Sequence, residues 1–175
     1  METVKHLEIK EGMTVKELVN EMNKCGVIGA GRIGKAAEIF NEMLSNKCKI
    51  FLGLAGAMVP GGMRNILKDL ILDGYVDVLV TTGANLTHDL AEALNFPHIK
   101  GESNVDDAKL YKEGYDRVFD SYLQNKAYQK MEDLFNEHLK EIEGKKLSGR
   151  EFLKLLGSWI KDKNSILRVC YEKNV

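Results

Sequence analysis

The spacing of hydrophobic positions predicts helices over most of the chain and two strands in its middle. Residues 14–17 read Thr-Val-Lys-Glu, a capping box, and the apolar residues that follow at helical spacing predict a helix ending near Gly26. A second helix is expected directly after it, because six apolar residues recur along one stripe. These residues are Ile33, Ala36, Ala37, Phe40, Met43 and Leu44.

Between residues 49 and 94 the pattern alternates strand, helix, strand and helix. Residues 49–54 are a short apolar run, and residues 76–82 are a β-branched run typical of strands inside parallel sheets. The helix between them is expected to include Pro60 as an early residue and to stop at Gly74. Its buried stripe is expected to contain Met63, Ile66, Leu67, Leu70 and Ile71. A further helix is expected over residues 86–94, and the unit predicts a parallel sheet with helices on its faces.

The second half of the chain has a helical pattern. A long helix is expected over residues 125–143, and Ser148-Gly-Arg-Glu151 caps the next one. Asn164 or Ser165 caps a last helix, and the sequence stops at Val175, where the alternation would next predict a strand. We therefore expect an α/β fold of Rossmann-like type. Its parallel sheet has helices on both faces, is incomplete at the C-terminus, and is joined by extra helices at the N-terminus and in the second half.

Charge and composition narrow the function classes. The net charge is −1, from 25 basic and 26 acidic residues, which gives no electrostatic footprint for nucleic acid. No apolar run approaches the roughly 18 residues of a membrane span, and the first residues lack the apolar region of a signal peptide. Three widely spaced cysteines and four histidines fit neither a disulfide framework nor a metal site. We expect a cytoplasmic protein that binds no nucleic acid, membrane or metal.

A glycine motif of dinucleotide-binding type lies at residues 29–34. It reads Gly-Ala-Gly-Arg-Ile-Gly, but it follows a predicted helix instead of a buried strand. About 20 residues past the motif, where such sites place an acidic residue for the ribose, stand Leu54, Ala55 and Gly56. These features favour a glycine-rich turn that admits tight packing between two helices.

Two other loops have the context that the first motif lacks. Gly53, Gly56, Gly61 and Gly62 lie between the end of a strand and the start of a helix, and residues 81–85 hold the equivalent place after the next strand. Ligands of open parallel sheets bind outside those strand ends, and helix N-termini attract phosphate. On the residues alone, a nucleotide site and a pair of plain tight turns both remain open.

Residues 51–94 resemble the N-terminal part of deoxyhypusine synthase in its archaeal form, without gaps from "FLGLAGAMVPGG" through "VDVLVTTGANLTHD". Residues 111–123 and 165–175 resemble later segments of the family. The resemblance implies a transferase that uses NAD to oxidise spermidine. The aminobutyl group then moves to one lysine of the hypusine-carrying translation initiation factor. It also implies a homotetramer with active sites between subunits.

The resemblance also implies site residues. Those that line the NAD site are Gly56, Ala57, Met58, Val59, Pro60, Thr82, Gly83 and Ala84. Thr87 and His88 fall where eukaryotic members have two glutamates near NAD and the polyamine, which implies substrate contact for both and cofactor contact for His88. Capping or plain exposure is the alternative for His88. For Asp89, a first-turn carboxylate favoured by the helix dipole is the alternative to an amine-binding group.

The family's catalytic lysine and its acidic spermidine-binding residues lie downstream of Val175. Lys68 and Lys145 sit on polar positions and are not expected to supply the desolvated amine that an imine mechanism needs. We therefore expect residues 1–175 to be the N-terminal part of a single NAD-binding α/β domain, inactive alone. Two alternatives remain, a non-catalytic paralogue that pairs with an active subunit and a related enzyme that forms homospermidine.

Overall fold

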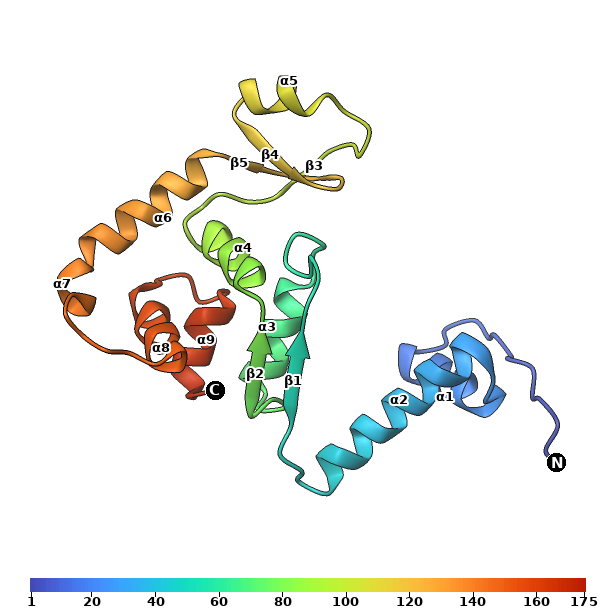
Figure 1. Cartoon of the computed structure of the whole chain (residues 1–175). Helices are drawn as coiled ribbons and strands as arrows, with labels where there is room; N and C mark the ends of the chain where they lie inside the picture. The colour runs from blue at the N-terminus through green and yellow to red at the C-terminus, as the bar shows by residue number, and fades with distance from the viewer. The chain divides into compact units, whose positions relative to one another are not determined.

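The computed structural model describes all residues 1–175, in two compact units. Residues 1–50 form the N-terminal unit, and residues 51–175 form the C-terminal unit (Figure 1). No helix of either unit has the length and apolar character that crossing a membrane requires.

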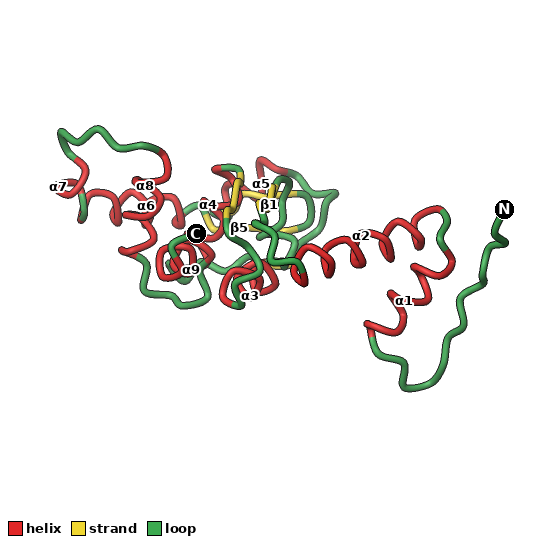
Figure 2. The backbone as a smooth tube through the Cα atoms, turned by 90° about the horizontal axis from the view of Figure 1, so that it is seen from below, coloured by secondary structure: helices red, strands yellow, loops and turns green.

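The N-terminal unit consists of an extended segment followed by helices α1 (Val15–Cys25) and α2 (Ile28–Ser45), which pack side by side (Figure 2). The predicted capping box is present, since Glu17 Oε2 lies 2.7 Å from the Thr14 amide nitrogen, which donates to it. Gly26 ends α1 in the left-handed conformation with φ 73°. Both predicted helices are confirmed.

Two glycines of the motif allow the close approach of α1 and α2. A Cβ atom on Gly31 would lie 2.3 Å from the carbonyl carbon of Gly26, and one on Gly34 would lie 2.3 Å from the amide nitrogen of Asn23. The predicted tight packing between two helices is confirmed. The motif lies inside α2, however, and not in a turn.

The N-terminal unit lacks a side-chain core. Among residues 1–49 no hydrophobic side chain is buried, and the only buried positions of α2 are Gly31 and Gly34. Of the predicted apolar stripe, Ile33, Ala36 and Ala37 are exposed, whereas the other three residues are half-buried.

The C-terminal unit begins with the predicted parallel sheet. Strands β1 (Phe51–Leu54) and β2 (Val78–Thr81) pair in parallel from Phe51↔Val78 to Leu54↔Thr81, with helix α3 (Arg64–Leu72) between them in sequence. Gly74, with φ 75°, closes the turn after α3 by donating its amide hydrogen to Ile71 O at 3.1 Å. The predicted α/β class with a parallel sheet is confirmed.

Two predictions for α3 are wrong. Pro60 is not an early helical residue, because residues 57–62 form a turn in which Gly61 N donates to Ala57 O and Gly62 adopts φ 85°. The helix starts four residues later, at Arg64. Ile66 is 56% exposed and does not belong to the buried stripe, which is carried by Leu67 and Ile71.

The rest of the C-terminal unit combines helices with a small antiparallel sheet of order β3-β5-β4, which the hydrophobic pattern did not predict. Its strands are β3 (Ile99–Lys100), β4 (Tyr115–Val118) and β5 (Ser121–Gln124). The helices are α4 (Gly83–Ala93), α5 (Asp107–Lys112), α6 (Lys126–Glu137), α7 (Leu139–Ile142), α8 (Gly149–Trp159) and α9 (Ile166–Lys173).

Helix boundaries differ from expectation in three places. The single helix expected over residues 125–143 is interrupted at His138, whose backbone leaves the helical region and whose ring stacks on Trp159 with centroids 4.4 Å apart. Helix α4 begins at Gly83, earlier than expected. Ser165, and not Asn164, caps α9, whereas the capping box of Ser148 and Glu151 on α8 is present as predicted.

Helix α9 connects two hydrophobic clusters. One cluster unites α4, α6 and α8 with Leu167 of α9, and the other unites the parallel sheet and α3 with Ile166 and Val169. Because these three residues from the first turn of α9 are divided between the two clusters, α9 holds the sheet and the helical half together.

Candidate functional site

The loops that follow β1 and β2 open at the same edge of the parallel sheet. Leu54 and Thr81, the last residues of the two strands, are register partners. The Thr81 hydroxyl also donates a hydrogen bond to Leu54 O at 3.0 Å. The loop at residues 55–63 and Thr82, the one residue between β2 and α4, therefore lie side by side, at the place where parallel sheets bind ligands (Figure 1).

The N-terminus of α4 faces this edge. Thr82 is the N-cap, and its hydroxyl accepts a hydrogen bond from Asn85 N at 3.3 Å. Gly83 and Ala84 are the first two residues of the helix, whose leading amide groups have no acceptor within the helix. A helix N-terminus of this kind favours an anionic group such as phosphate.

Asn85 carries an unpaired acceptor beneath these residues. Its side chain is 1% exposed, and its Nδ2 donates to Thr81 Oγ1 at 3.4 Å, but its Oδ1 has no hydrogen-bond partner. A buried acceptor left without a donor costs about 1–3 kcal/mol. This atom lies at the position where the loops of the two strands meet.

The structure brings together most residues that the resemblance assigned to NAD. Gly56 and Ala57 are exposed in the loop after β1, and Thr82, Gly83 and Ala84 are exposed at the start of α4. Met58 and Pro60 are half-buried. Val59 differs from them, because its side chain is 3% exposed and belongs to the core cluster of the sheet and α3.

Space is available beside the glycines of both loops. A Cβ atom built on Gly53, Gly56 or Gly83 would meet no atom within 4 Å. Gly56 also adopts φ 79°, which disfavours a side chain there. The open space, the helix N-terminus and the unpaired Asn85 Oδ1 together fit the phosphate-and-sugar part of a dinucleotide.

Thr87 and His88 lie in the second turn of α4, and both are half-buried. The Thr87 hydroxyl donates to Gly83 O at 2.9 Å within its own helix. His88 caps nothing. Its Nδ1 lies 2.9 Å from Nε2 of His98, and the two rings have centroids 4.9 Å apart.

His98 and Glu92 extend this contact into a chain of three polar side chains. His98 Nδ1 lies 2.6 Å from Glu92 Oε1, and the His98 amide nitrogen donates to the same oxygen at 3.0 Å. The sequence pattern did not single out either residue. The spacing of His88 and Glu92, four apart on one helix, is the one signal that it contained.

Burial and hydrogen bonding set the charges of this chain. Burial raises the pKa of Glu92, but the hydrogen bonds from the His98 side chain and backbone outweigh it and hold the pKa below its ordinary value. Burial, reinforced by repulsion from His98, lowers the pKa of His88. At neutral pH Glu92 is therefore ionised and His88 is neutral.

Asp89 fits neither alternative drawn from the sequence. It lies in the middle of α4 with 0% exposure, so it is neither a first-turn carboxylate nor accessible to an amine ligand. Its Oδ1 accepts from Arg64 Nε at 2.7 Å and from Ile166 N at 3.0 Å. Its Oδ2 accepts from Ser165 Oγ at 2.7 Å and from Leu167 N at 3.0 Å. Asp89 thus caps α9 from another helix, a role that local sequence cannot reveal.

The nucleophile candidates have surroundings unsuited to catalysis. Lys68 lies 3.1 Å from Asp69, and Lys145 is exposed. Burial, together with the charge of Asp89, raises the pKa of the Cys170 thiol to about 12, so this cysteine is not a thiolate near neutral pH.

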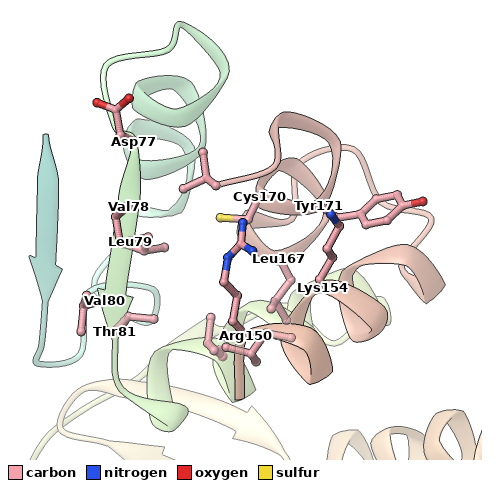
Figure 3. A pocket seen from close by; sticks show the side chains of 13 residues that line it. Asp77, Val78, Leu79, Val80, Thr81, Arg150, Lys154, Leu167, Cys170 and Tyr171 are labelled. Carbon is pink, nitrogen blue, oxygen red and sulfur yellow. The ribbon is translucent and has the colours of Figure 1, made fainter. Parts of the chain in front are cut away.

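A groove of 390 Å³ follows the edge of β2 that does not pair with β1 (Figure 3). Its lining includes every residue from Asp77 to Thr81, which means that it runs along the strand edge and not over one face. The opposite wall belongs to α8, α9 and the C-terminal residue. It consists of Arg150, Leu153, Lys154, Leu167, Cys170, Tyr171 and Val175.

The chain matches known proteins over nearly its whole length. The family model for deoxyhypusine synthase matches residues 17–175. A probable deoxyhypusine synthase of Methanosarcina thermophila is 46% identical over 173 residues, which cover 98% of this chain and 54% of the relative. One of Methanothermobacter thermautotrophicus is 39% identical over 175 residues, which cover 98% of this chain and 57% of the relative.

A crystal structure from Entamoeba histolytica, described as a candidate deoxyhypusine synthase, shares the fold with a TM-score of 0.63 at 19% identity. It covers 98% of this chain, and the chain covers 60% of it. The chain spans about half the length of the curated relatives it matches, 54% for the first of them.

Proposed function

Because the chain belongs to the deoxyhypusine synthase family, we propose that it contributes part of the NAD site of an enzyme that transfers the aminobutyl group of spermidine to a lysine of the hypusine-carrying translation initiation factor. In this proposal residues 1–175 are the N-terminal part of one NAD-binding α/β domain, and the active assembly is a homotetramer. The observation that carries it is the unpaired Asn85 Oδ1 at the edge where the loops after β1 and β2 meet.

The residues that would hold NAD are those of the two loops. The leading amides of α4, at Gly83 and Ala84, would bind a phosphate, and Asn85 Oδ1 would accept a hydrogen bond from a hydroxyl or amide group. The loop at Gly56 and Ala57 would contact the cofactor through its backbone. When bound, NAD supplies the hydride acceptor for oxidation of the polyamine.

The chain spans 54% of its first relative, and we propose that the remainder of the family's chain supplies the groups for the transfer step and completes the site. A two-stranded sheet with a free edge is marginal, and the groove beside β2 has the apolar lining that an added strand requires. Val175 lines the groove together with Asp77 and Val78, so a segment following residue 175 starts at the groove. We assign the groove to a strand from that remainder.

The test is a reconstitution assay. The purified chain is mixed with NAD, labelled spermidine and the acceptor factor, with or without the C-terminal remainder of the Methanosarcina thermophila relative as a separate chain. We expect label on the acceptor lysine only in the presence of the second chain. Transfer by residues 1–175 alone would refute the proposal, because a lysine of this chain would then be the nucleophile.

Two further outcomes distinguish the alternatives. Docking without transfer would indicate a non-catalytic paralogue. When putrescine is added as a second acceptor, label in homospermidine instead of on the factor would indicate an enzyme that forms homospermidine. Leu153→Glu, in the groove, should weaken docking at least tenfold, whereas Leu139→Glu, which is 47% exposed outside the groove, should not change it.

A further inference from the structure

A continuous line of hydrogen bonds joins Glu92, His98 and His88. The NAD contacts proposed above do not involve it. The line runs from the Glu92 carboxylate to the imidazole of His98, at 2.6 Å, and on to the imidazole of His88, at 2.9 Å. The His98 side chain is 6% exposed and that of Glu92 is 24% exposed. The half-buried ring of His88 is its outer end.

The backbone holds His98 in this place. Asn95 adopts φ 66° and Phe96 N donates to Ala91 O, so the chain folds back over the last turn of α4. Pro97 follows, and the His98 amide nitrogen donates to the same Glu92 oxygen that the ring contacts. Two donors from one residue fix both the carboxylate and the ring.

When His98 is neutral, the line of hydrogen bonds sets which nitrogen of each histidine carries a proton. An ionised carboxylate can only accept, so His98 Nδ1 must carry hydrogen. In neutral His98 the Nε2 atom is then the acceptor, and Nδ1 of neutral His88 must be the donor. The remaining nitrogen of His88, Nε2, is left with a free electron pair and is therefore a base.

The same line of hydrogen bonds can transfer a positive charge from His88 to His98. When Nε2 of His88 binds a proton, the Nδ1 proton of His88 moves to Nε2 of His98. His98 is then an imidazolium with protons on both nitrogens, and its Nδ1 proton still bonds to the Glu92 carboxylate. The positive charge rests beside its counter-ion, and His88 remains neutral.

His88 lies within reach of the candidate NAD site. It is four residues after Ala84, so the two share one face of α4 and are about 6 Å apart along the helix axis. Arg64, whose charge also acts on Glu92, is engaged by Asp89 and Asp162. The charged groups that act on the line are thus Glu92 and, at longer range, Arg64.

We propose that His88 is the general base that removes the ammonium proton of the polyamine substrate, with His98 and Glu92 as its positioning residues. A polyamine nitrogen is protonated at neutral pH, and hydride can leave the neighbouring carbon only after that nitrogen regains its electron pair. The proton moves from the ammonium nitrogen to Nε2 of His88, and the line transfers one positive charge to His98. This step rests on the proposed function, whereas the hydrogen-bonded line does not.

The direct test is the tautomeric state of each histidine, read from two-bond proton–nitrogen NMR correlations of the nitrogen-labelled chain at pH 8. We expect His88 and His98 both as Nδ1–H tautomers, with Nε2 of His88 unprotonated. Exposed His6 should show the Nε2–H form that free histidine favours. A wild-type His88 in the Nε2–H form would overturn the proposal without the need for any variant.

Matched variants sharpen the test. Glu92→Gln removes the counter-ion while keeping the side-chain shape, and we expect a larger Nε2–H population at His88. Glu141→Gln removes the same type of contact, 2.7 Å from Nδ1 of His138, and should leave His88 unchanged. An unchanged His88 in Glu92→Gln would also overturn the proposal.

Activity in the reconstituted assembly distinguishes a failure of the proposed function from a failure of the proposed role of His88. His88→Gln should lower kcat by about 10² to 10⁴, the range of general-base catalysis, with little change in KM for NAD. Glu92→Gln should shift the rising limb of the pH profile of kcat to lower pH, because a base without its counter-ion holds its proton less tightly. Correct tautomers without any spermidine turnover would refute the proposed function and the polyamine as substrate, and turnover that His88→Gln does not slow would refute the base.

Discussion

The glycine motif of the N-terminal unit and the glycine loops of the C-terminal unit have similar sequences and opposite surroundings. A Cβ atom on Gly34 would lie 2.3 Å from Asn23 N, whereas one on Gly83 would meet nothing within 4 Å. The first glycine is required because two helix backbones touch. The second leaves space beside a helix N-terminus. A glycine pattern therefore reports a binding site only when the strand and helix around it provide one.

The two units also differ in how they are stabilised. Residues 1–49 contain no buried hydrophobic side chain, whereas the C-terminal unit has two buried clusters joined by α9. In the C-terminal unit a buried carboxylate, Asp89, ties three helices together. We expect the N-terminal unit to open locally at a low free-energy cost and the C-terminal unit to unfold cooperatively.

The largest predicted effect is that of Asp89→Asn. The amide places an N–H donor against donors from Ile166 or Leu167 and leaves the Arg64 charge without its buried partner. We expect the C-terminal unit to lose about 3–5 kcal/mol of unfolding free energy, measured by urea denaturation. Hydrogen exchange of α1 and α2 should not change.

Asp162→Asn is the matched control for this variant. Asp162 pairs with the same Arg64 at 2.9 Å but is 26% exposed, so its loss should cost at most about 1 kcal/mol. Equal losses from the two variants would mean that the cap on α9 contributes nothing.

Sequence and structure agree where the signals are local, and they differ where a contact spans the chain. Gly26 and Gly74 stop their helices as predicted, because a positive φ needs only the residue itself. The partners of Asp89 on α9 are 76 to 78 residues away, and no local pattern reports such a contact. The short strands β4 and β5 contain a single buried residue, Leu123, and their other residues are half-buried, so they lack the alternation by which strands are recognised.

The same limit applies to the candidate site. The loops after β1 and β2 could be located from the strand-to-helix context of Gly56 and Gly83. The line of Glu92, His98 and His88 could not, because it depends on the fold-back of the chain at Asn95. The prediction that Pro60 is an early helical residue was wrong for a related reason, because a proline fits the first turn of a helix and an irregular turn equally well.

Gly34→Ala is predicted to have the next largest effect, confined to the N-terminal unit. Its methyl group would overlap the backbone of Asn23, so α1 and α2 must separate, at a cost of about 1–3 kcal/mol or more. Hydrogen exchange of α1 should accelerate while the C-terminal unit keeps its protection.

Gly29→Ala tests the comparison within the same motif. A Cβ atom there meets nothing within 4 Å, so alanine should stabilise α2 by up to about 1 kcal/mol. Similar destabilisation by both alanines would show that the glycines of this motif are not distinguished by packing.

Gly83→Val is predicted to weaken NAD binding to the reconstituted assembly by about tenfold, equivalent to about 1.4 kcal/mol. The added methyl groups would enter the open space beside the first turn of α4, and stability should change by less than about 0.5 kcal/mol. Calorimetric titration with NAD measures the effect. Gly29→Val is the control, and weaker binding in that variant alone would return the NAD site to residues 29–34.

The smallest predicted effects come from the two capping boxes, which have the same chemistry in different units. The Glu17 carboxylate accepts from Thr14, and that of Glu151 accepts from Ser148, both at 2.7 Å from the hydroxyl oxygen. Replacing either hydroxyl residue by alanine costs about 1 kcal/mol. For Ser148→Ala this loss should lower the global stability of the C-terminal unit. For Thr14→Ala it should appear as about fivefold faster local exchange in α1, because α1 has no core that holds it.

Acid should weaken both contributions. Hydrogen bonds from the Thr14 backbone and hydroxyl lower the pKa of Glu17, and those from the Ser148 hydroxyl and backbone lower the pKa of Glu151, each from an ordinary value of 4.5. A carboxylate with a lowered pKa in the folded state stabilises it above the unfolded value, and this contribution disappears as the pH falls through the folded value. The difference between each alanine variant and the wild type should therefore be full at pH 7 and shrink below pH 4.5. A Thr14→Ala chain that instead loses global stability at pH 7 would show that α1 unfolds together with the C-terminal unit, against the comparison of an open and a cooperative unit.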